Sequence, residues 1–138
     1  MKTLLPMLIA ALLLAASCGG GASNEPTDQP TLTVEMSDYK VVADRTEVPA
    51  GRVVFAIRNR SAMVHELKIL KTDAAPDQLP YDQGSAKAKE DGKVGGLENI
   101  AGGVSRKLIL DLAPGKYVLV CNVAGHYMLG MRSAIEVK

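Results

Sequence analysis

The chain has 138 residues, of which 47% are hydrophobic and 22% are charged, with no Trp and a single Phe. This length and composition predict one globular domain with a single core. The charges nearly balance, with 16 Lys and Arg against 15 Asp and Glu, so nothing indicates the clustered basic face that nucleic-acid binding requires. Only two Cys and two His are present, which leaves few ligands for any metal or redox site.

The N-terminus has the pattern of an export signal. Lys2 precedes an apolar run over residues 4–16, and small residues then lead to Cys18, as in a secretory signal peptide that is too short to span a bilayer well. The stretch ending at Cys18 resembles a bacterial lipobox, although Ala15 stands where Leu is expected. We therefore expect removal of residues 1–17 and lipidation of Cys18. The alternative is an ordinary signal peptide cleaved nearby, with Cys18 incidental.

Residues 18–30 hold the expected lipidated Cys and a run of Gly, Pro and polar residues. Such a run is typical of a flexible tether between an anchor and a domain. The expected location is therefore exported, as a membrane-anchored lipoprotein in the periplasm or at the cell surface. That compartment is oxidising and favours disulfides. If Cys18 is acylated, Cys121 has no partner, and a lone thiol persists more readily when something else occupies it.

From residue 31 onward the hydrophobic period becomes two, as in strands with one buried face. Leu32, Val34 and Met36 alternate with polar residues. Similar patterns recur over 53–59, 65–69, 107–112, 116–120 and 135–138. Several short strands with turns between them, such as Ala-Pro-Gly at 113–115, predict an antiparallel sandwich or small barrel.

The alternation lapses between residues 71 and 103, where the chain is polar and rich in Gly. We expect a long loop with room for one short helix near residues 86–90. Because loops of this length are uncommon in compact domains, the stretch should carry some structure or cover one end of the fold.

The densest chemical signal is the segment Cys-Asn-Val-Ala-Gly-His-Tyr-Met-Leu-Gly-Met, residues 121–131. Cys121 ends a predicted strand, and His126 and Met131 follow within one loop. A thiolate, an imidazole and a thioether suit copper in both oxidation states, and a second imidazole would complete the trigonal His₂Cys set with a weak axial Met of blue-copper sites. That imidazole can only be His65, the other His of the chain.

His65 is predicted to share a strand face with Leu67 and Ile69, while Glu66 and Lys68 take the other face. The alternation points the imidazole inward, where an unpaired ring is costly unless it is hydrogen-bonded or bound to a metal. Each of the four residues alone has an ordinary explanation in core packing, but their joint occurrence favours a copper site.

Residues 31–138 resemble a cupredoxin of the azurin, plastocyanin and sulfocyanin kind. The resemblance implies a Greek-key β-sandwich of about eight strands, with one copper ion per chain near one rim. It assigns equatorial bonds to His65, Cys121 and His126 and the axial contact to Met131. The matching segments are Asn59 followed by His65-Glu66-Leu67, Leu112-Ala113-Pro114-Gly115-Lys116-Tyr117, and Cys121 through Met131.

The spacing within the loop bears on the axial ligand. Cys-x₄-His resembles azurin, whereas His-x₄-Met resembles plastocyanin. An azurin-like axial position falls on Gly130, which has no donor, and Met128 is too close behind His126 to reach the axial side without strain. Met131 is the expected axial ligand, with Met128 as the open alternative.

Other residues have two interpretations each. Asn59 resembles the Asn that braces the two ligand loops of the family and hydrogen-bonds near the thiolate, but Asn also suits a strand end for turn reasons. Tyr127, Met128 and Leu129 are expected either in the core or in the apolar rim through which cupredoxins meet their partners.

The resemblance implies electron transfer by one copper, not an enzyme. Copper nitrite reductases and multicopper oxidases need further His-rich sites, and a dinuclear copper A centre needs two Cys in one loop. A hydrolase needs a nucleophile and a base, but both His are already used. The alternatives are a copper-binding or delivery protein and a cupredoxin-like interaction module. We expect a monomer whose partners are redox proteins (a cytochrome, oxidase or reductase), with membrane contact through the N-terminal lipid and no nucleic acid.

Overall fold

The computed structural model describes residues 29–138, within which the chain forms strands and no helix. Accordingly, these residues hold no helix that could cross a membrane. The predicted signal peptide, Cys18 and the tether up to residue 28 lie outside the described residues. The strands are β1 (Thr31–Ser37), β2 (Lys40–Ala43), β3 (Glu47–Val48), β4 (Gly51–Asn59), β5 (His65–Lys71), β6 (Tyr81–Asp82), β7 (Lys87–Ala88), β8 (Lys93–Ile100), β9 (Ser105–Leu112), β10 (Gly115–Val120) and β11 (Arg132–Val137).

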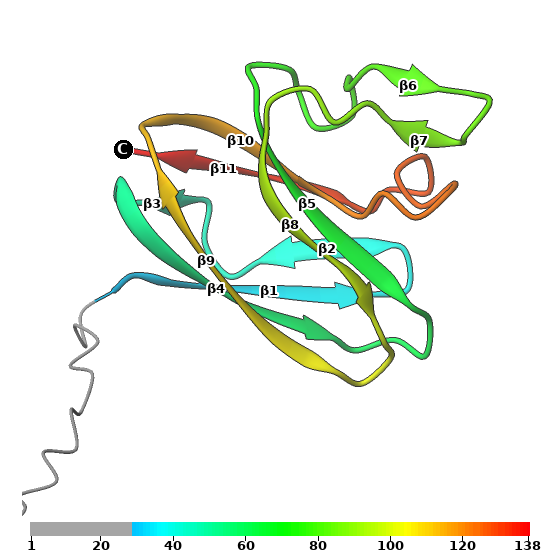
Figure 1. Ribbon diagram of the computed structural model, residues 1–138, viewed down its shortest axis with the longest axis horizontal. Helices are drawn as coiled ribbons and strands as arrows, with labels where there is room; N and C mark the ends of the chain where they lie inside the picture. The colour runs from blue at the N-terminus through cyan, green and yellow to red at the C-terminus, as the bar shows by residue number, and fades with distance from the viewer. Residues whose placement is uncertain (1–28) are drawn as a thin grey trace, which may run out of the picture.

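Two sheets face each other (Figure 1), one in the order β2-β1-β4-β9 and the other in the order β3-β11-β10-β5-β8. The pairs β1–β4 and β3–β11 are parallel, and the other neighbours are antiparallel. The predicted all-β sandwich is confirmed. Three of the eleven strands (β3, β6 and β7) have only two residues, so the longer strands agree with the expected number of about eight.

The main core lies between the two sheets. Every second side chain of β1, β5 and β10 is buried there, as a strand period of two requires. Fully burying a side chain such as Leu or Ile contributes about 1.5–3 kcal/mol, so this layer holds the sandwich together. Its largest fully buried apolar members are Tyr117, Phe55, Leu32, Met36, Ile57, Leu67, Ile69, Ile100, Leu119 and Met131.

A second, smaller core lies on the outer face of the five-stranded sheet, under residues 72–92, which we call the covering segment. Its buried members are Leu70, Leu79, Ala88, Val118, Val120 and Tyr127. The stretch in which the alternation lapses therefore carries real structure, including the β6–β7 hairpin and the eight-residue strand β8.

The short helix predicted near residues 86–90 is wrong, because Lys87 and Ala88 form strand β7. The backbone N–H of Ala88 donates to Asn122 Oδ1 at 2.8 Å, and Asn122 Nδ2 donates to the Ala88 carbonyl at 2.9 Å. A side-chain amide thus takes both backbone groups that a helix would use internally, and it holds this residue extended.

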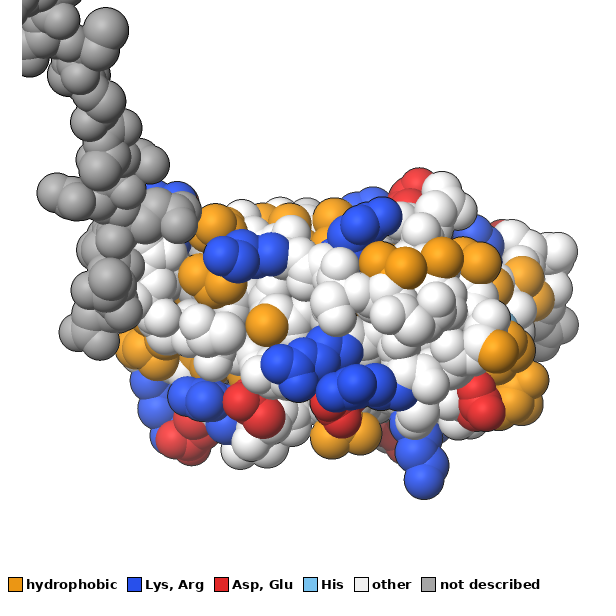
Figure 2. Space-filling view, turned by 90° about the horizontal axis from the view of Figure 1, so that it is seen from below, with side chains coloured by type: hydrophobic (Ala, Val, Ile, Leu, Met, Phe, Trp, Pro, Cys, Tyr) orange, Lys and Arg blue, Asp and Glu red, His pale blue; other side chains and the backbone are white. Residues whose placement is uncertain are grey.

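The two ends of the sandwich differ. The start of β1 and the C-terminal end of the chain lie at one end, while the loop between β10 and β11 lies at the other (Figure 1). At this second end the Tyr39 ring, from the β1–β2 turn, lies 5.7 Å from the His126 ring in an edge-on arrangement. In Figure 2, Lys and Arg side chains spread over the middle of the molecule, and apolar side chains are visible at both ends.

Candidate metal centre

Three polypeptide segments bring the predicted donors together. Cys121 directly follows β10, and His126 lies in the loop that leads on to β11. His65 is the first residue of β5, which pairs with β10 in antiparallel register. Because antiparallel neighbours place the start of one strand beside the end of the other, His65 lies next to Cys121 although the two are far apart in the sequence.

The donor atoms form a small triangle. Cys121 Sγ lies 3.5 Å from His126 Nδ1 and 3.7 Å from His65 Nδ1, and the two Nδ1 atoms are 3.3 Å apart. A metal about 2.0–2.3 Å from nitrogen and thiolate donors, placed at the centre of a trigonal set, separates the donors by about 3.5–3.8 Å. The triangle is therefore the right size for one metal ion, and its donor types suit copper.

The loop closes tightly around these donors. The Cys121 N–H donates to the Met131 carbonyl at 3.0 Å, and the Met131 N–H donates to the His126 carbonyl at 3.1 Å. Gly125 and Gly130 have φ values of +82° and +107°, a region that L side chains rarely adopt. The sequence Gly-His-x₃-Gly-Met therefore permits the two sharp turns that bring the loop back to its own start.

Met131 and Met128 occupy opposite environments. Met131 is fully buried in the main core together with Cys121, whereas the Met128 side chain is 59% exposed. Because Met131 shares a buried core with Cys121, it is the better placed of the two to meet a metal bound by the three other donors. The environments thus support the choice of Met131 that spacing alone had suggested.

Hydrogen bonds fix the orientation of the buried His65 ring. With Nδ1 facing the triangle, the opposite nitrogen, Nε2, donates to Ser61 Oγ at 2.8 Å. Ser61 Oγ in turn donates to Asn59 Oδ1 at 2.9 Å. Partners of this kind set the tautomer and orientation of a metal-binding imidazole.

Asn59 braces the loop that precedes His65. Its Nδ2 donates to the carbonyls of Met63 at 2.7 Å and Ile100 at 2.9 Å. The predicted bracing role therefore fits the His65 side of the site, but the hydrogen bonds of Asn59 go to residues other than Cys121. Sequence reasoning missed Ser61, which links Asn59 to His65, because an isolated Ser carries no distinctive signal.

The group that reaches the Cys121 sulfur is a backbone amide. The Glu66 N–H donates to Sγ at 3.5 Å, and since any residue except Pro could supply this N–H, no residue type in the sequence indicates it. Burial raises the pKa of the Cys121 thiol despite the opposing hydrogen bonds from backbone N–H groups of Glu66 and Val123. Burial and the adjacent His126 ring lower the pKa of His65. The copper-free site thus holds a thiol and a neutral imidazole, and a metal must displace the thiol proton.

The three rim candidates separate clearly. Tyr127 is buried in the second core, where its hydroxyl accepts from the Leu79 N–H at 2.9 Å and its ring stacks on Tyr81. Met128 and Leu129 are 59% and 58% exposed. The core interpretation therefore holds for Tyr127, whereas Met128 and Leu129 lie at the surface beside the half-buried His126.

Known structures share this fold. Auracyanin from Roseiflexus castenholzii matches with a TM-score of 0.60 at 22% identity, over 80% of this chain and 98% of that chain. Rusticyanin from Thiobacillus ferrooxidans matches with a TM-score of 0.54 at 21% identity, over 78% and 77%. Auracyanin A from Chloroflexus aurantiacus, described as a "blue" copper protein, matches with a TM-score of 0.51 at 24% identity, over 78% and 99%.

Sequence comparison identifies the family. No curated protein sequence matches the chain. A family model described as a cupredoxin-like domain matches residues 6–131, which is well over half of the sequence. The chain belongs to the cupredoxin-like domain family.

Proposed function

We propose that this protein is an electron carrier with a single type 1 copper, bound equatorially by His65, Cys121 and His126 and axially by Met131. The observation that carries the proposal is the triangle of Sγ and two Nδ1 atoms, with edges of 3.3–3.7 Å. Met131 is buried in the same core as Cys121. A copper ion held there would exchange one electron between its +2 and +1 states.

The protein surroundings favour fast exchange of that electron. His65 is fixed by Ser61, and Cys121 is fixed by the Glu66 N–H and by its position between β10 and the closing loop. Ligands held in this way move little when the charge of the site changes by one unit. Little movement means a small reorganisation energy, which suits a carrier.

The exposed side of the site supports His126 as the route for the electron. His65 and Cys121 are fully buried, whereas His126 is half-buried. Met128 and Leu129 give this end an apolar surface, and we propose it as the contact surface for a redox protein such as a cytochrome, an oxidase or a reductase. A partner docked there would meet the imidazole edge with water excluded.

Two other functions receive less support. A copper-delivery protein is expected to expose a cluster of Met residues, but of the four Met within residues 29–138 only Met128 is exposed. An interaction module without metal has no need for the complete donor set. Enzymes with additional copper sites would need His ligands beyond the two in this chain.

Absorption and voltammetry of the copper-loaded protein test the proposal. We expect an intense blue colour from thiolate-to-copper charge transfer and a reversible one-electron couple with fast self-exchange. Cys121→Ser should abolish the colour, and the matched variant Cys18→Ser should keep it. A colourless, redox-silent copper(II) complex would refute the carrier function, and slow exchange would favour delivery.

We further propose export and anchoring through a lipid on Cys18. In the described part of the chain, β1 starts at the end of the sandwich opposite the β10–β11 loop (Figure 1), so a tether at that end would leave the copper end free for partners. Mass spectrometry of the mature N-terminus tests this proposal. A mature chain that begins at another residue and carries no acyl group would refute the anchor.

A further inference from the structure

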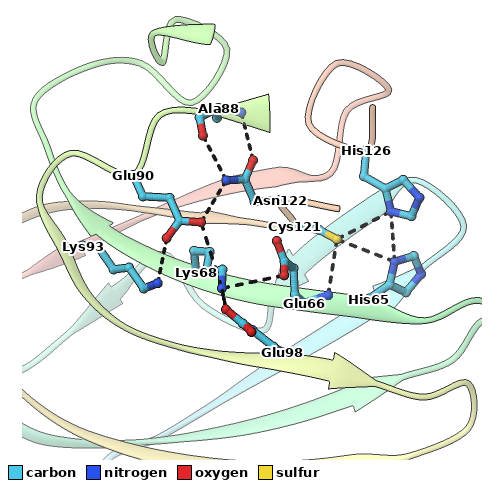
Figure 3. A network of polar contacts seen from close by, with 10 residues as sticks. All are labelled: His65, Glu66, Lys68, Ala88, Glu90, Lys93, Glu98, Cys121, Asn122 and His126. Atoms are coloured by element: carbon cyan, nitrogen blue, oxygen red, sulfur yellow. Dashed lines mark hydrogen bonds and ion pairs between the residues drawn. The ribbon is translucent and has the colours of Figure 1, made fainter. Parts of the chain in front are cut away.

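A charged network that runs from a buried lysine to the surface lies beside Cys121, on the outer face of β5 (Figure 3). At its centre is Lys68, whose side chain is only 3% exposed. Its ammonium lies 3.7 Å from a Glu66 carboxylate oxygen and 4.0 Å from a Glu90 oxygen, and it forms an ion pair with Glu98. Because burying an unpaired ammonium costs several kcal/mol, these carboxylates are what keeps Lys68 charged inside the protein.

The backbone is shaped to admit this network. Leu97 pairs with Leu67, and Ile100 pairs with His65, so β8 has one residue more than β5 over this stretch. Such a bulge re-aims a side chain, and here it leaves the Glu98 carboxylate directed at Lys68.

Two further residues of β8 suit the local backbone beside Lys68. Asn99, within the bulge, has a φ of +53°, a conformation that Asn tolerates better than most residues. Gly96 pairs with Lys68 across the sheet, and a Cβ at Gly96 would lie 3.1 Å from Lys68 Cδ and 2.5 Å from the Leu67 carbonyl oxygen. The β5 backbone therefore requires a glycine here, and the absence of a side chain also leaves room for the aliphatic part of Lys68.

The network touches the residue that follows each of two ligands. Glu66 follows His65, and its backbone N–H donates to Cys121 Sγ while its carboxylate faces Lys68. Asn122 follows Cys121, and its Nδ2 donates to Glu90 Oε1 at 3.0 Å. Lys68 is thus connected to Cys121 through Glu66 on one side, and through Glu90 and Asn122 on the other.

We propose that Lys68 is a positioning residue of the metal centre. Lys68 keeps the Glu66 N–H hydrogen-bonded to the Cys121 sulfur, and its positive charge favours the reduced over the oxidised site. This inference rests on the proposed copper function. Reduction removes one positive charge from the site, so a fixed cation nearby opposes oxidation, and a carboxylate favours it. Lys68 and Glu98 should therefore shift the reduction potential in opposite directions.

Four variants test the inference by voltammetry at pH 8, where the carboxylates are charged. Lys68→Met removes the charge and keeps a similar aliphatic side chain, so we expect a reduction potential below that of the wild type. Lys68→Arg keeps the charge and should have a potential close to that of the wild type. Glu98→Gln should raise the potential. Lys93→Met is the matched control, because Lys93 contacts Glu90 on its exposed side and its loss should change the potential least. The shift from Lys68→Met should persist in high salt, since buried charges are poorly screened.

A second readout needs no copper. Hydrogen exchange at the Glu66 amide of the apoprotein should be faster in Lys68→Met than in the wild type or Lys93→Met. A folded Lys68→Met variant with both the potential and the Glu66 exchange rate of the wild type would overturn the inference. Lys68→Met and Glu98→Gln shifting the potential in the same direction would overturn it as well, because loosened packing rather than charge would then be the cause.

Two outcomes separate this inference from the proposed function. If the wild type shows no reversible couple, the carrier function fails, and the Glu66 exchange rates still decide whether Lys68 positions the amide. If Lys68→Met does not fold, Glu98→Gln decides the electrostatic part, and a potential equal to or below that of the wild type refutes it.

Discussion

The two faces of β5 are buried by different means. The inner face, with His65, Leu67 and Ile69, packs against the opposite sheet in an apolar core. The outer face carries Glu66, Lys68 and Leu70 and lies under the covering segment and beside β8. The inner face excludes water by apolar contact alone, whereas the outer face combines a small apolar core around Leu70 with a buried lysine, Lys68, that is paired with carboxylates.

This difference assigns a separate task to each face. The apolar face places His65 at a fixed depth in the sandwich, since neighbouring side chains allow it no alternative position. The charged face controls what surrounds the ligands, because charges act over several ångströms at low dielectric. A single strand therefore positions one ligand and sets the electrostatic environment of another.

The largest expected difference between the two faces of β5 is in the unfolding free energy that is lost when a buried Leu is replaced by Ala. Leu67→Ala, on the inner face, should lower the free energy of unfolding of the apoprotein by about 3–5 kcal/mol, because the closely packed sheets cannot collapse into the cavity. Leu70→Ala removes an equally buried side chain on the outer face. There the covering segment can shift inward, so we expect about 2–3 kcal/mol. Urea unfolding measures both losses, and equal values would contradict the distinction.

The inner face was predictable from sequence because its residues alternate with polar ones. Leu32, Val34 and Met36 likewise located β1 within a residue at each end. The three donors that the structure brings together, His65, Cys121 and His126, were predictable for a different reason. With only two His and two Cys in the chain, scarcity left little choice, and loop spacing favoured Met131.

The burial of Lys68 and Glu66 on the outer face was not predictable, because it depends on pairing between polar groups. Lys68 and Glu66 look like solvent-facing residues in an alternating strand, and only the fold shows that Glu98 and Glu90 cover them. Asn122 determines the path of the covering segment, yet its partners are backbone groups of Ala88, which have no sequence signature. The helix predicted at residues 86–90 failed for the same reason.

A loss of unfolding free energy of intermediate size is expected where the covering segment contacts the β10–β11 loop. Tyr127→Phe removes the hydroxyl that accepts from the buried Leu79 N–H, leaving that donor unpaired at a cost of about 1–2 kcal/mol. Tyr39→Phe is the matched control, because Tyr39 is 41% exposed and surface changes of this kind stay within about 0.5 kcal/mol. Urea unfolding at neutral pH compares the two variants, and similar small losses in both would show that the segment does not depend on this contact.

The smallest expected effect is a pH dependence of the free energy of unfolding that comes from Glu90, which belongs to the charged network on the outer face of β5. Burial alone would raise the pKa of Glu90, but hydrogen bonds from Lys93 and Asn122 and the charges of Lys68 and Lys93 lower it overall. A carboxyl with a lowered folded-state pKa contributes stability above its unfolded pKa of about 4.3 and loses that contribution as the pH falls through the folded value. Glu90 is partly exposed to solvent, so the contribution should be below about 1 kcal/mol.

The variant Glu90→Gln isolates this contribution. It cannot titrate, so its free energy of unfolding should fall less between pH 6 and pH 3 than that of the wild type, while at pH 6 it should be the less stable of the two. Urea unfolding of both apoproteins across this range gives the two slopes. Parallel slopes would mean that the Glu90 carboxylate gains nothing from its partners in the folded state. The pairing of charges on the outer face would then rest on Glu66 and Glu98, the two carboxylates nearest to Lys68.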